Sequence, residues 1–230
     1  NEFVRCGAKV VLLDLDADAC DAMVEEVKGM GGDALALGCD VTNDESVGAA
    51  AAAVEQAYGG CDVLVNNAGI LRPGKLEDIS MADWQKLLDI NLTGYLRCSQ
   101  AFGRSMLARG AGAHVHVASI AASEPQALSG AYSPSKAAVV MLSRQMAFEW
   151  GPRGIRSNVV SPGLVRTPLS EAFYQAPGVL ERRAQAIPTR RICTPEDIAD
   201  VAVFLASVRA GHVTGQEIVV DGGLSQTLMS

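Results

Sequence analysis

Short apolar runs alternate along the chain with longer segments of helical character. Several runs are apolar on both faces, as the strands of a helix-covered parallel sheet must be. The expected strands lie at 9–14, 34–39, 63–66, 113–118, 155–160 and 217–220. The expected helices lie at 17–30, 44–58, 81–109 with a bend, 132–150 and 195–207. This alternation predicts an α/β fold, a doubly wound parallel sheet flanked by helices in a single domain of residues 1–230, with ligands at the carboxyl ends of the strands.

Three residues at fixed spacing carry candidate chemistry: Ser119, Tyr132 and Lys136. Tyr132 and Lys136 share one face of the predicted helix, one turn apart. A nearby ammonium favours the ionised form of a phenol, so the pair could exchange a proton with an alcohol oxygen, and Ser119 could hold that oxygen. By chance a Tyr-x-x-x-Lys arises with odds of about one in eleven here, and the whole triplet of about one in 160. The triplet alone is therefore suggestive.

Further motifs accompany the triplet. They are Asp62-Val-Leu-Val-Asn-Asn-Ala-Gly69, Ile90-Asn-Leu-Thr-Gly94, Asn158-Val-Val-Ser-Pro-Gly-Leu-Val-Arg-Thr167 and Val213-Thr-Gly-Gln-Glu-Ile-Val-Val-Asp-Gly-Gly223. Together, in this order, they closely resemble the short-chain dehydrogenase/reductase family over essentially the whole chain. The resemblance implies a Rossmann-type fold and an oxidoreductase that transfers a hydride between NAD(H) and a secondary alcohol or ketone.

The start of the chain departs from the family pattern. In this family the first strand leads into a Gly-rich turn that cradles the cofactor pyrophosphate at a helix N-terminus. Residues 1–9 resemble the second half of the helix after that turn, running into the second strand. We therefore expect the first strand to be missing from this sequence, which leaves the second and fourth strands without their shared neighbour.

Composition narrows the possible partners. A net charge of −7 and a pI near 5.0 argue against nucleic acid. The six cysteines show no C-x-x-C spacing, and His114 and His116 lack metal-ligand spacing, so they are interpreted as helix-packed or edge histidines and no metal is expected. With no spanning apolar stretch and no signal-peptide pattern, we expect a cytoplasmic protein without a membrane partner.

Asp14, at the end of the second strand, decides the expected cofactor. A carboxylate there accepts hydrogen bonds from both adenosine ribose hydroxyls and repels a 2′-phosphate, which predicts NAD over NADP. Asp16 and Asp18 reinforce the charge, although such a cluster could instead cap a helix. The resemblance implies further cofactor contacts at Leu15, Asp40, Val41, Asn67, Ala68, Gly69, Tyr132, Lys136, Pro162, Gly163, Val165 and Thr167.

The resemblance also implies a mechanism. Tyr132 as phenolate takes the hydroxyl proton of a substrate held by Ser119, while Lys136 lowers the pKa of Tyr132 and holds the nicotinamide ribose. Asn91 resembles the fourth catalytic residue of the family, with an ordinary helix-interior asparagine as the competing interpretation. Glu124 could touch substrate or be a solvated loop acid.

Residues 164–194 correspond to the family's variable substrate lid. Leu169, Phe173 and Tyr174 suggest a partly apolar pocket, with Gln126 and Leu128 on the opposite wall. Arg166 could pair with an anionic substrate, though a solvent-facing role is favoured. The substrate class stays open among cyclic or aryl alcohols, sugars, hydroxysteroids and 3-oxoacyl thioesters, the acidic charge counting against an acyl-carrier-protein substrate. A non-catalytic scaffold or sensor is the alternative from another class.

A homotetramer is also expected. Family members pair the helices at 81–109 and 132–150 across one two-fold axis and the final strand and C-terminus across another, which generates four subunits. Apolar side chains on these helices exceed what one sheet face should need, although all of them could be internal core. They are Phe102, Met106, Met141, Met146, Phe148 and Trp150.

Overall fold

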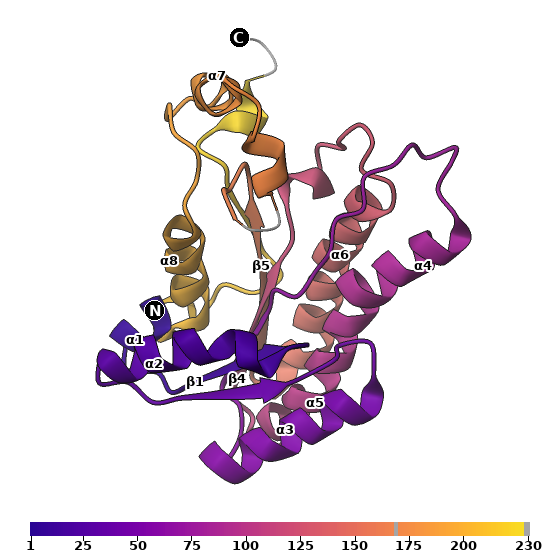
Figure 1. Cartoon of the computed structure of the whole chain (residues 1–230). Helices are drawn as coiled ribbons and strands as arrows, with labels where there is room; N and C mark the ends of the chain where they lie inside the picture. Colours follow the sequence, from indigo (N-terminus) through magenta and orange to yellow (C-terminus); the bar gives the residue numbers. More distant parts are fainter. Residues whose placement is uncertain (168–169, 228–230) are drawn as a thin grey trace.

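The computed structural model of the chain describes residues 1–167 and 170–227, and its strands form two parallel sheets (Figure 1). The smaller sheet pairs β1 (Val10–Asp14) with β2 (Ala34–Gly38). The larger sheet has the order β3-β4-β5-β6. Its strands are β3 (Val63–Asn66), β4 (Gly112–Val117), β5 (Ile155–Pro162) and β6 (Glu217–Val220). The α/β Rossmann-like fold that the sequence predicts is confirmed.

The two sheets do not hydrogen-bond to each other within the described ranges: β1 pairs with β2, and β3 pairs with β4. In Figure 1 the smaller sheet runs across the strands of the larger one. Hydrophobic packing connects them instead: side chains of β1 and β2 pack on a buried cluster contributed mainly by two helices. That cluster includes Val47, Ala50, Val54, Cys98, Phe102 and Met106. Burial of apolar area therefore holds the two sheets in one body.

Two predicted helices have the expected bounds, α3 (Asp44–Tyr58) and α6 (Tyr132–Trp150). The N-terminus of α3 is fixed because the Asn43 side chain accepts a hydrogen bond from the backbone N–H of Ser46 (2.8 Å). The predicted helix 17–30 is instead a 3₁₀ turn (Ala17–Cys20) followed by α2 (Asp21–Gly29). The predicted 195–207 helix is α8 (Pro195–Ala206), opened by a capping box at Thr194.

The bend predicted within 81–109 is a π-helical turn, Asp89–Thr93, between α4 (Met81–Leu88) and α5 (Gly94–Arg109). The end of a helix expected within residues 1–9 is α1 (Glu2–Arg5), whereas the sequence pattern did not predict α7 (Val179–Ala186). Short 3₁₀ turns lie at Ile120–Ala122, Gly151–Arg153, Glu171–Tyr174, Val208–Ala210 and Leu224–Gln226.

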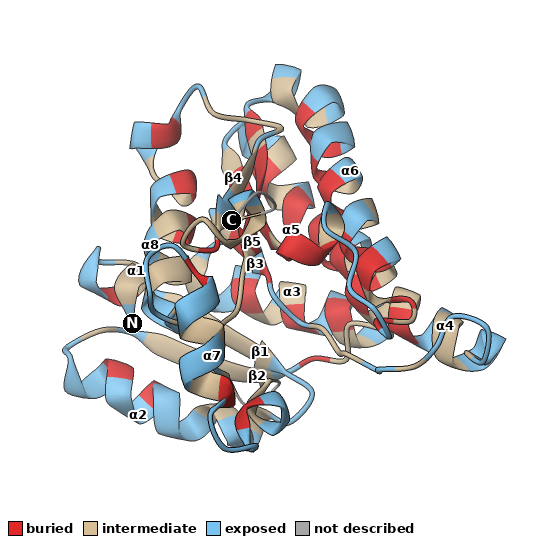
Figure 2. Cartoon of the chain, turned by 90° about the horizontal axis from the view of Figure 1, so that it is seen from above, coloured by how far each residue is buried: buried red, intermediate tan, exposed pale blue. Residues whose placement is uncertain are grey.

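Helices cover both faces of the larger sheet. α5 and α6 pack on one face, and α8 with the short α1 packs on the other (Figure 1). Figure 2 shows the buried residues concentrated along α5, α6 and the strands they cover, whereas α2 and α7 are mostly exposed. β4 lies between β3 and β5, so the edge position considered for His114 and His116 is wrong: both rings are fully buried beneath α5 and α6.

Most of the apolar side chains expected at a subunit interface are internal. Phe102, Met106 and Met146 are buried, and Trp150 packs on the core cluster, so for these four the core interpretation was right. Met141 and Phe148 are exposed, at 58% and 81%. Among the described residues, none of the helices is long and apolar enough to cross a membrane.

Candidate active site

The structure brings Ser119, Tyr132 and Lys136 together just beyond the carboxyl end of β4. The Lys136 side chain is only 4% exposed; its Nζ donates to the carbonyl oxygen of Val117 (2.8 Å) and lies 5.6 Å from the centre of the Tyr132 ring. The Ser119 hydroxyl is close enough to Tyr132 to lower the pKa of its phenol. Ser119 is oriented by the turn it caps, because its Oγ accepts a hydrogen bond from the Ala121 N–H (3.1 Å).

Burial shapes the proton affinities of this cluster. It raises the pKa of Tyr132, and the Ser119 hydroxyl opposes that rise. Burial also lowers the pKa of Lys136 to about 8, since an ammonium without water around it loses solvation energy. Lys136 donates its hydrogen bond to the Val117 carbonyl rather than to Tyr132, and a lowering of the Tyr132 pKa by its ammonium stays a prediction.

Asn91 lies in the π-helical turn and is fully buried. Its amide makes a reciprocal pair with the backbone of Ile70: Oδ1 accepts from the Ile70 N–H (2.8 Å), and Nδ2 donates to the Ile70 oxygen (2.9 Å). A Cβ on Gly69 would lie 3.3 Å from Asn91 Oδ1 and 3.8 Å from Lys136 Nζ. Asn91 therefore fastens the loop after β3 beside Lys136, and its catalytic role stays a prediction.

The residues expected to contact adenosine lie at the carboxyl ends of β1 and β2. Asp14 is exposed, and its Oδ1 accepts from the Asp16 N–H (3.1 Å); Leu15 is 76% exposed. Asp16 caps the following 3₁₀ turn, as the capping interpretation proposed. Asp40 accepts from the N–H and hydroxyl of Thr42 (2.9 and 2.7 Å), bonds that lower the pKa of Asp40.

Val41, next to Asp40, packs against the first turn of α5: a Cβ on Gly94 would lie 2.9 Å from Val41 Cγ2. After β3, Asn67 and Ala68 are exposed and Gly69 is half-buried. These segments present backbone and small side chains, rather than bulky ones, at the ends of β2 and β3.

The loop after β5 carries the remaining predicted cofactor residues. Pro162 ends the strand, and Gly163 donates its N–H to the Val220 oxygen (2.9 Å), so close to Asp221 that a Cβ would come within 2.6 Å. Val165 forms an isolated bridge with Cys193. The Thr167 N–H donates to Ser170 Oγ (3.0 Å).

The predicted nucleotide contacts thus follow the carboxyl ends of β1, β2, β3 and β5, apart from Tyr132 and Lys136 on α6. An exposed carboxylate suited to ribose hydroxyls, small residues in close approach and a buried phenol–ammonium pair fit a nicotinamide dinucleotide. Among the described residues, no group of His, Cys, Asp or Glu could hold a metal ion.

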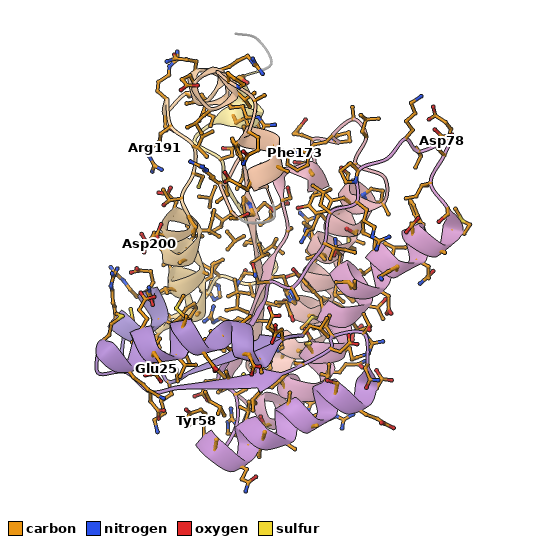
Figure 3. The ribbon with its side chains drawn as sticks, in the orientation of Figure 1. Glu25, Tyr58, Asp78, Phe173, Arg191 and Asp200 are labelled. Carbon is orange, nitrogen blue, oxygen red and sulfur yellow. The ribbon has the colours of Figure 1, made fainter. Side chains whose placement is uncertain are left out.

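The predicted lid follows the carboxyl end of β5 along the chain. Figure 3 shows Phe173 on its 3₁₀ turn, and that side chain is 41% exposed. Tyr174 is buried instead, with the Arg183 guanidinium 4.7 Å from its ring centre. Arg166 faces solvent and pairs with Glu171 through two 2.8 Å hydrogen bonds. The predicted pocket residue Leu169 lies outside the described residues.

Between Ser119 and Tyr132, the side chains of Glu124, Gln126 and Leu128 are exposed, as expected for residues of a solvent-facing loop.

The sequence reasoning did not find one neighbour of Lys136. Tyr95, one turn beyond Asn91, places its ring centre 5.4 Å from Lys136 Nζ. Its only sequence signal is that spacing from Asn91.

Comparisons with known proteins agree with this geometry. A family model described as Enoyl-(Acyl carrier protein) reductase matches residues 1–225. The chain is 41% identical over 223 residues to D-threitol dehydrogenase of Mycolicibacterium smegmatis, covering 97% of this chain and 85% of that protein. It is 39% identical over 226 residues to galactitol 2-dehydrogenase (L-tagatose-forming) of Cereibacter sphaeroides, covering 96% and 87%.

A solved gluconate 5-dehydrogenase from Burkholderia cenocepacia J2315, in complex with NADP and tartrate, superposes with a TM-score of 0.91. The two are 31% identical, and the match covers 97% of this chain and 88% of that one. The fold and the site define a dinucleotide-dependent oxidoreductase. The chain belongs to the short-chain dehydrogenase/reductase family and acts on CH–OH groups with NAD(P).

Proposed function

We propose that this protein interconverts a secondary alcohol and a ketone on a small polyhydroxylated molecule, with NAD(H) as cofactor. The observation that carries the proposal is the buried cluster in which the Ser119 hydroxyl and the Lys136 ammonium lie beside Tyr132. Relatives named for threitol, galactitol and gluconate support the substrate class, since all three compounds carry several hydroxyls. The exposed Glu124 and Gln126 could hydrogen-bond such hydroxyls.

Each residue of the cluster has a separate role in this proposal. Ser119 donates a hydrogen bond to the substrate oxygen, Tyr132 takes the hydroxyl proton, and the Lys136 ammonium stabilises the phenolate. A bound nicotinamide supplies the acceptor for the hydride that leaves the carbinol carbon, so the products are a ketone, the reduced cofactor and a proton. Asn91 holds the loop after β3 against Lys136.

The cofactor preference rests on Asp14. Its exposed carboxylate accepts hydrogen bonds from ribose hydroxyls and repels a 2′-phosphate. Asp40, Val41 and the Asn67–Gly69 turn complete the adenosine side, and the loop from Pro162 to Thr167 holds the nicotinamide side. Solved relatives are described with NADP, so the preference for NAD has to be measured against it.

Two further proposals concern assembly and the lid. Met141 and Phe148, seven positions apart on α6, leave apolar surface exposed, which supports pairing of α6 with another subunit in a homotetramer. Residues 164–194 act as the substrate lid. The cytoplasmic location stays a prediction.

A substrate panel tests the function. Purified protein is mixed with NAD and, separately, D-threitol, galactitol, gluconate, a hydroxysteroid and a secondary alcohol with one hydroxyl, and NADH formation is followed by absorbance. We expect kcat/KM for at least one polyol to exceed that for the monohydroxy alcohol tenfold or more. In a second assay with NADH in place of NAD, reduction of a 3-oxoacyl thioester by a protein without polyol activity would favour the thioester reductase. NADH binding without turnover in either assay would favour the scaffold.

Tyr132→Phe is the matched variant, because it keeps the ring and removes the proton carrier. We expect it to lose at least a thousandfold in kcat, in line with loss of general acid–base catalysis, while NADH still binds. Retention of more than a tenth of the wild-type kcat would contradict the assignment of Tyr132.

A further inference from the structure

Tyr95, on the first turn of α5, is buried directly against Lys136. Only 1% of the residue is exposed, and its hydroxyl donates to the Val117 carbonyl oxygen (3.1 Å). The same oxygen accepts from Lys136 Nζ (2.8 Å), so one carbonyl connects the two side chains. The Tyr95 ring centre also lies 5.4 Å from Lys136 Nζ, within the range of a cation–π contact.

Neighbouring side chains fix the position of the Tyr95 ring. His116 on β4 stacks on it, with the ring centres 6.0 Å apart and the planes at 24°. Buried side chains of β5 and α6 surround it in the same apolar cluster. A buried aromatic ring packed on several sides has one position, so the ring offers a fixed face to the ammonium.

Lys136 has few other partners for its charge. The Tyr132 ring on α6 faces it, with 5.6 Å between Nζ and the ring centre. Gly69 lies between Lys136 Nζ and the side-chain amide of Asn91. Among the described residues, no Asp, Glu, Arg or second Lys pairs with it, and its four fellow lysines are exposed. A desolvated ammonium in such a place needs either a ring face or a carbonyl to keep its proton.

We propose that Tyr95 is a positioning residue for the reaction: its ring and its hydroxyl fix the Lys136 ammonium and the Val117 carbonyl, which keeps Lys136 charged beside Tyr132. The inference rests on the proposed acid–base function of Tyr132 and Lys136 and adds a residue to it. His116, behind the ring, stays neutral in the assay range, because burial holds its pKa at about 3. Burial likewise keeps the Tyr95 phenol itself protonated by raising its pKa.

Two variants separate the ring from the hydroxyl. Tyr95→Phe keeps the ring and loses the bond to Val117, whereas Tyr95→Leu loses both. The full chain, labelled with ¹³C and ¹⁵N at lysine, is titrated by NMR, and the buried lysine is assigned with Lys136→Met. We expect the pKa of Lys136 to fall by about one unit more in Tyr95→Leu than in Tyr95→Phe, a tenfold change in its protonation equilibrium.

A shape-preserving series covers the case in which Tyr95→Leu fails to fold. Phenylalanines with one, two and three ring fluorines at this position keep the packing but weaken the negative ring face, so the pKa of Lys136 should fall stepwise. The pH profile of alcohol oxidation should shift alkaline in parallel, since a neutral lysine no longer favours the phenolate.

An unchanged pKa of Lys136 across the fluorinated series would overturn the role of the ring, and so would equal pKa values in Tyr95→Phe and Tyr95→Leu. The proposed function fails separately: if Tyr132→Phe keeps its activity, the NMR titration still decides whether Tyr95 holds the Lys136 charge.

Discussion

Replacing His114 with leucine should make the fold less sensitive to acid. The His114 ring is fully buried on β4, stacked against His116 and edge-on to Trp150 at 5.5 Å. Neither of its ring nitrogens has a hydrogen-bond partner among the described residues. Burial lowers the pKa of His114 to about 4, because the imidazolium would have to give up its hydration. At mildly acidic pH, His114 is therefore neutral in the native protein but protonated in the unfolded chain.

The sign and size follow from that difference. Unfolded histidine takes a proton near pH 6.5, so below that pH the unfolded state binds more protons than the native state. The stability that neutral His114 provides is fully present above pH 6.5 and is lost as the pH falls toward about 4. Between pH 7.5 and 5.0 the loss is about 2 kcal/mol, a large share of the typical 5–15 kcal/mol of a native protein.

Denaturant unfolding followed by circular dichroism at both pH values measures this, at one protein concentration. In His114→Leu the decrease in the free energy of unfolding from pH 7.5 to 5.0 should be smaller than in the wild type by about 2 kcal/mol. Carboxylates that titrate in this range are the same in both proteins and cancel. His212, the exposed third histidine, gives the control His212→Leu, which should keep the wild-type decrease. Equal decreases in wild type and His114→Leu would refute the argument.

Three further outcomes are expected. Asp14→Ala should shift the kcat/KM ratio of NAD to NADP toward NADP by at least tenfold, about 1.4 kcal/mol, and an unchanged ratio would place cofactor selection elsewhere. Gly154→Ala should cost about 3 kcal/mol of stability or prevent folding, because φ is +80° and a Cβ would lie 2.0 Å from the Gly110 oxygen; Gly151→Ala, with φ −52° and open space, should be near neutral by the same unfolding assay. Phe148→Glu should reduce the molar mass seen by light scattering, and a monomeric wild type would remove the proposed tetramer altogether.

Local pattern was enough to predict several elements to the residue. α3 and α6 have the bounds read from apolar periodicity and turn residues, and β3 and β6 coincide with apolar runs between turns. The position of Tyr132 and Lys136 on one helix face also follows from spacing alone, because the helical repeat fixes which side chains are neighbours. The motif order then sufficed for the family.

Other features depend on residues far apart in the chain. The helical repeat places Met146 and Phe148 on different faces of α6, but it does not say which face is buried, since that depends on the elements packed on the helix. The hydrogen bond of Lys136 to Val117 does not follow from spacing, because burial and the nearby carbonyl decide where the ammonium points. The sequence thus determined the elements and the chemistry of the site, through interactions between near neighbours in the chain. Only the tertiary structure decided which groups lose water and which partners replace it, as in the contact of Tyr95 with Lys136, because desolvation is a property of the packed interior.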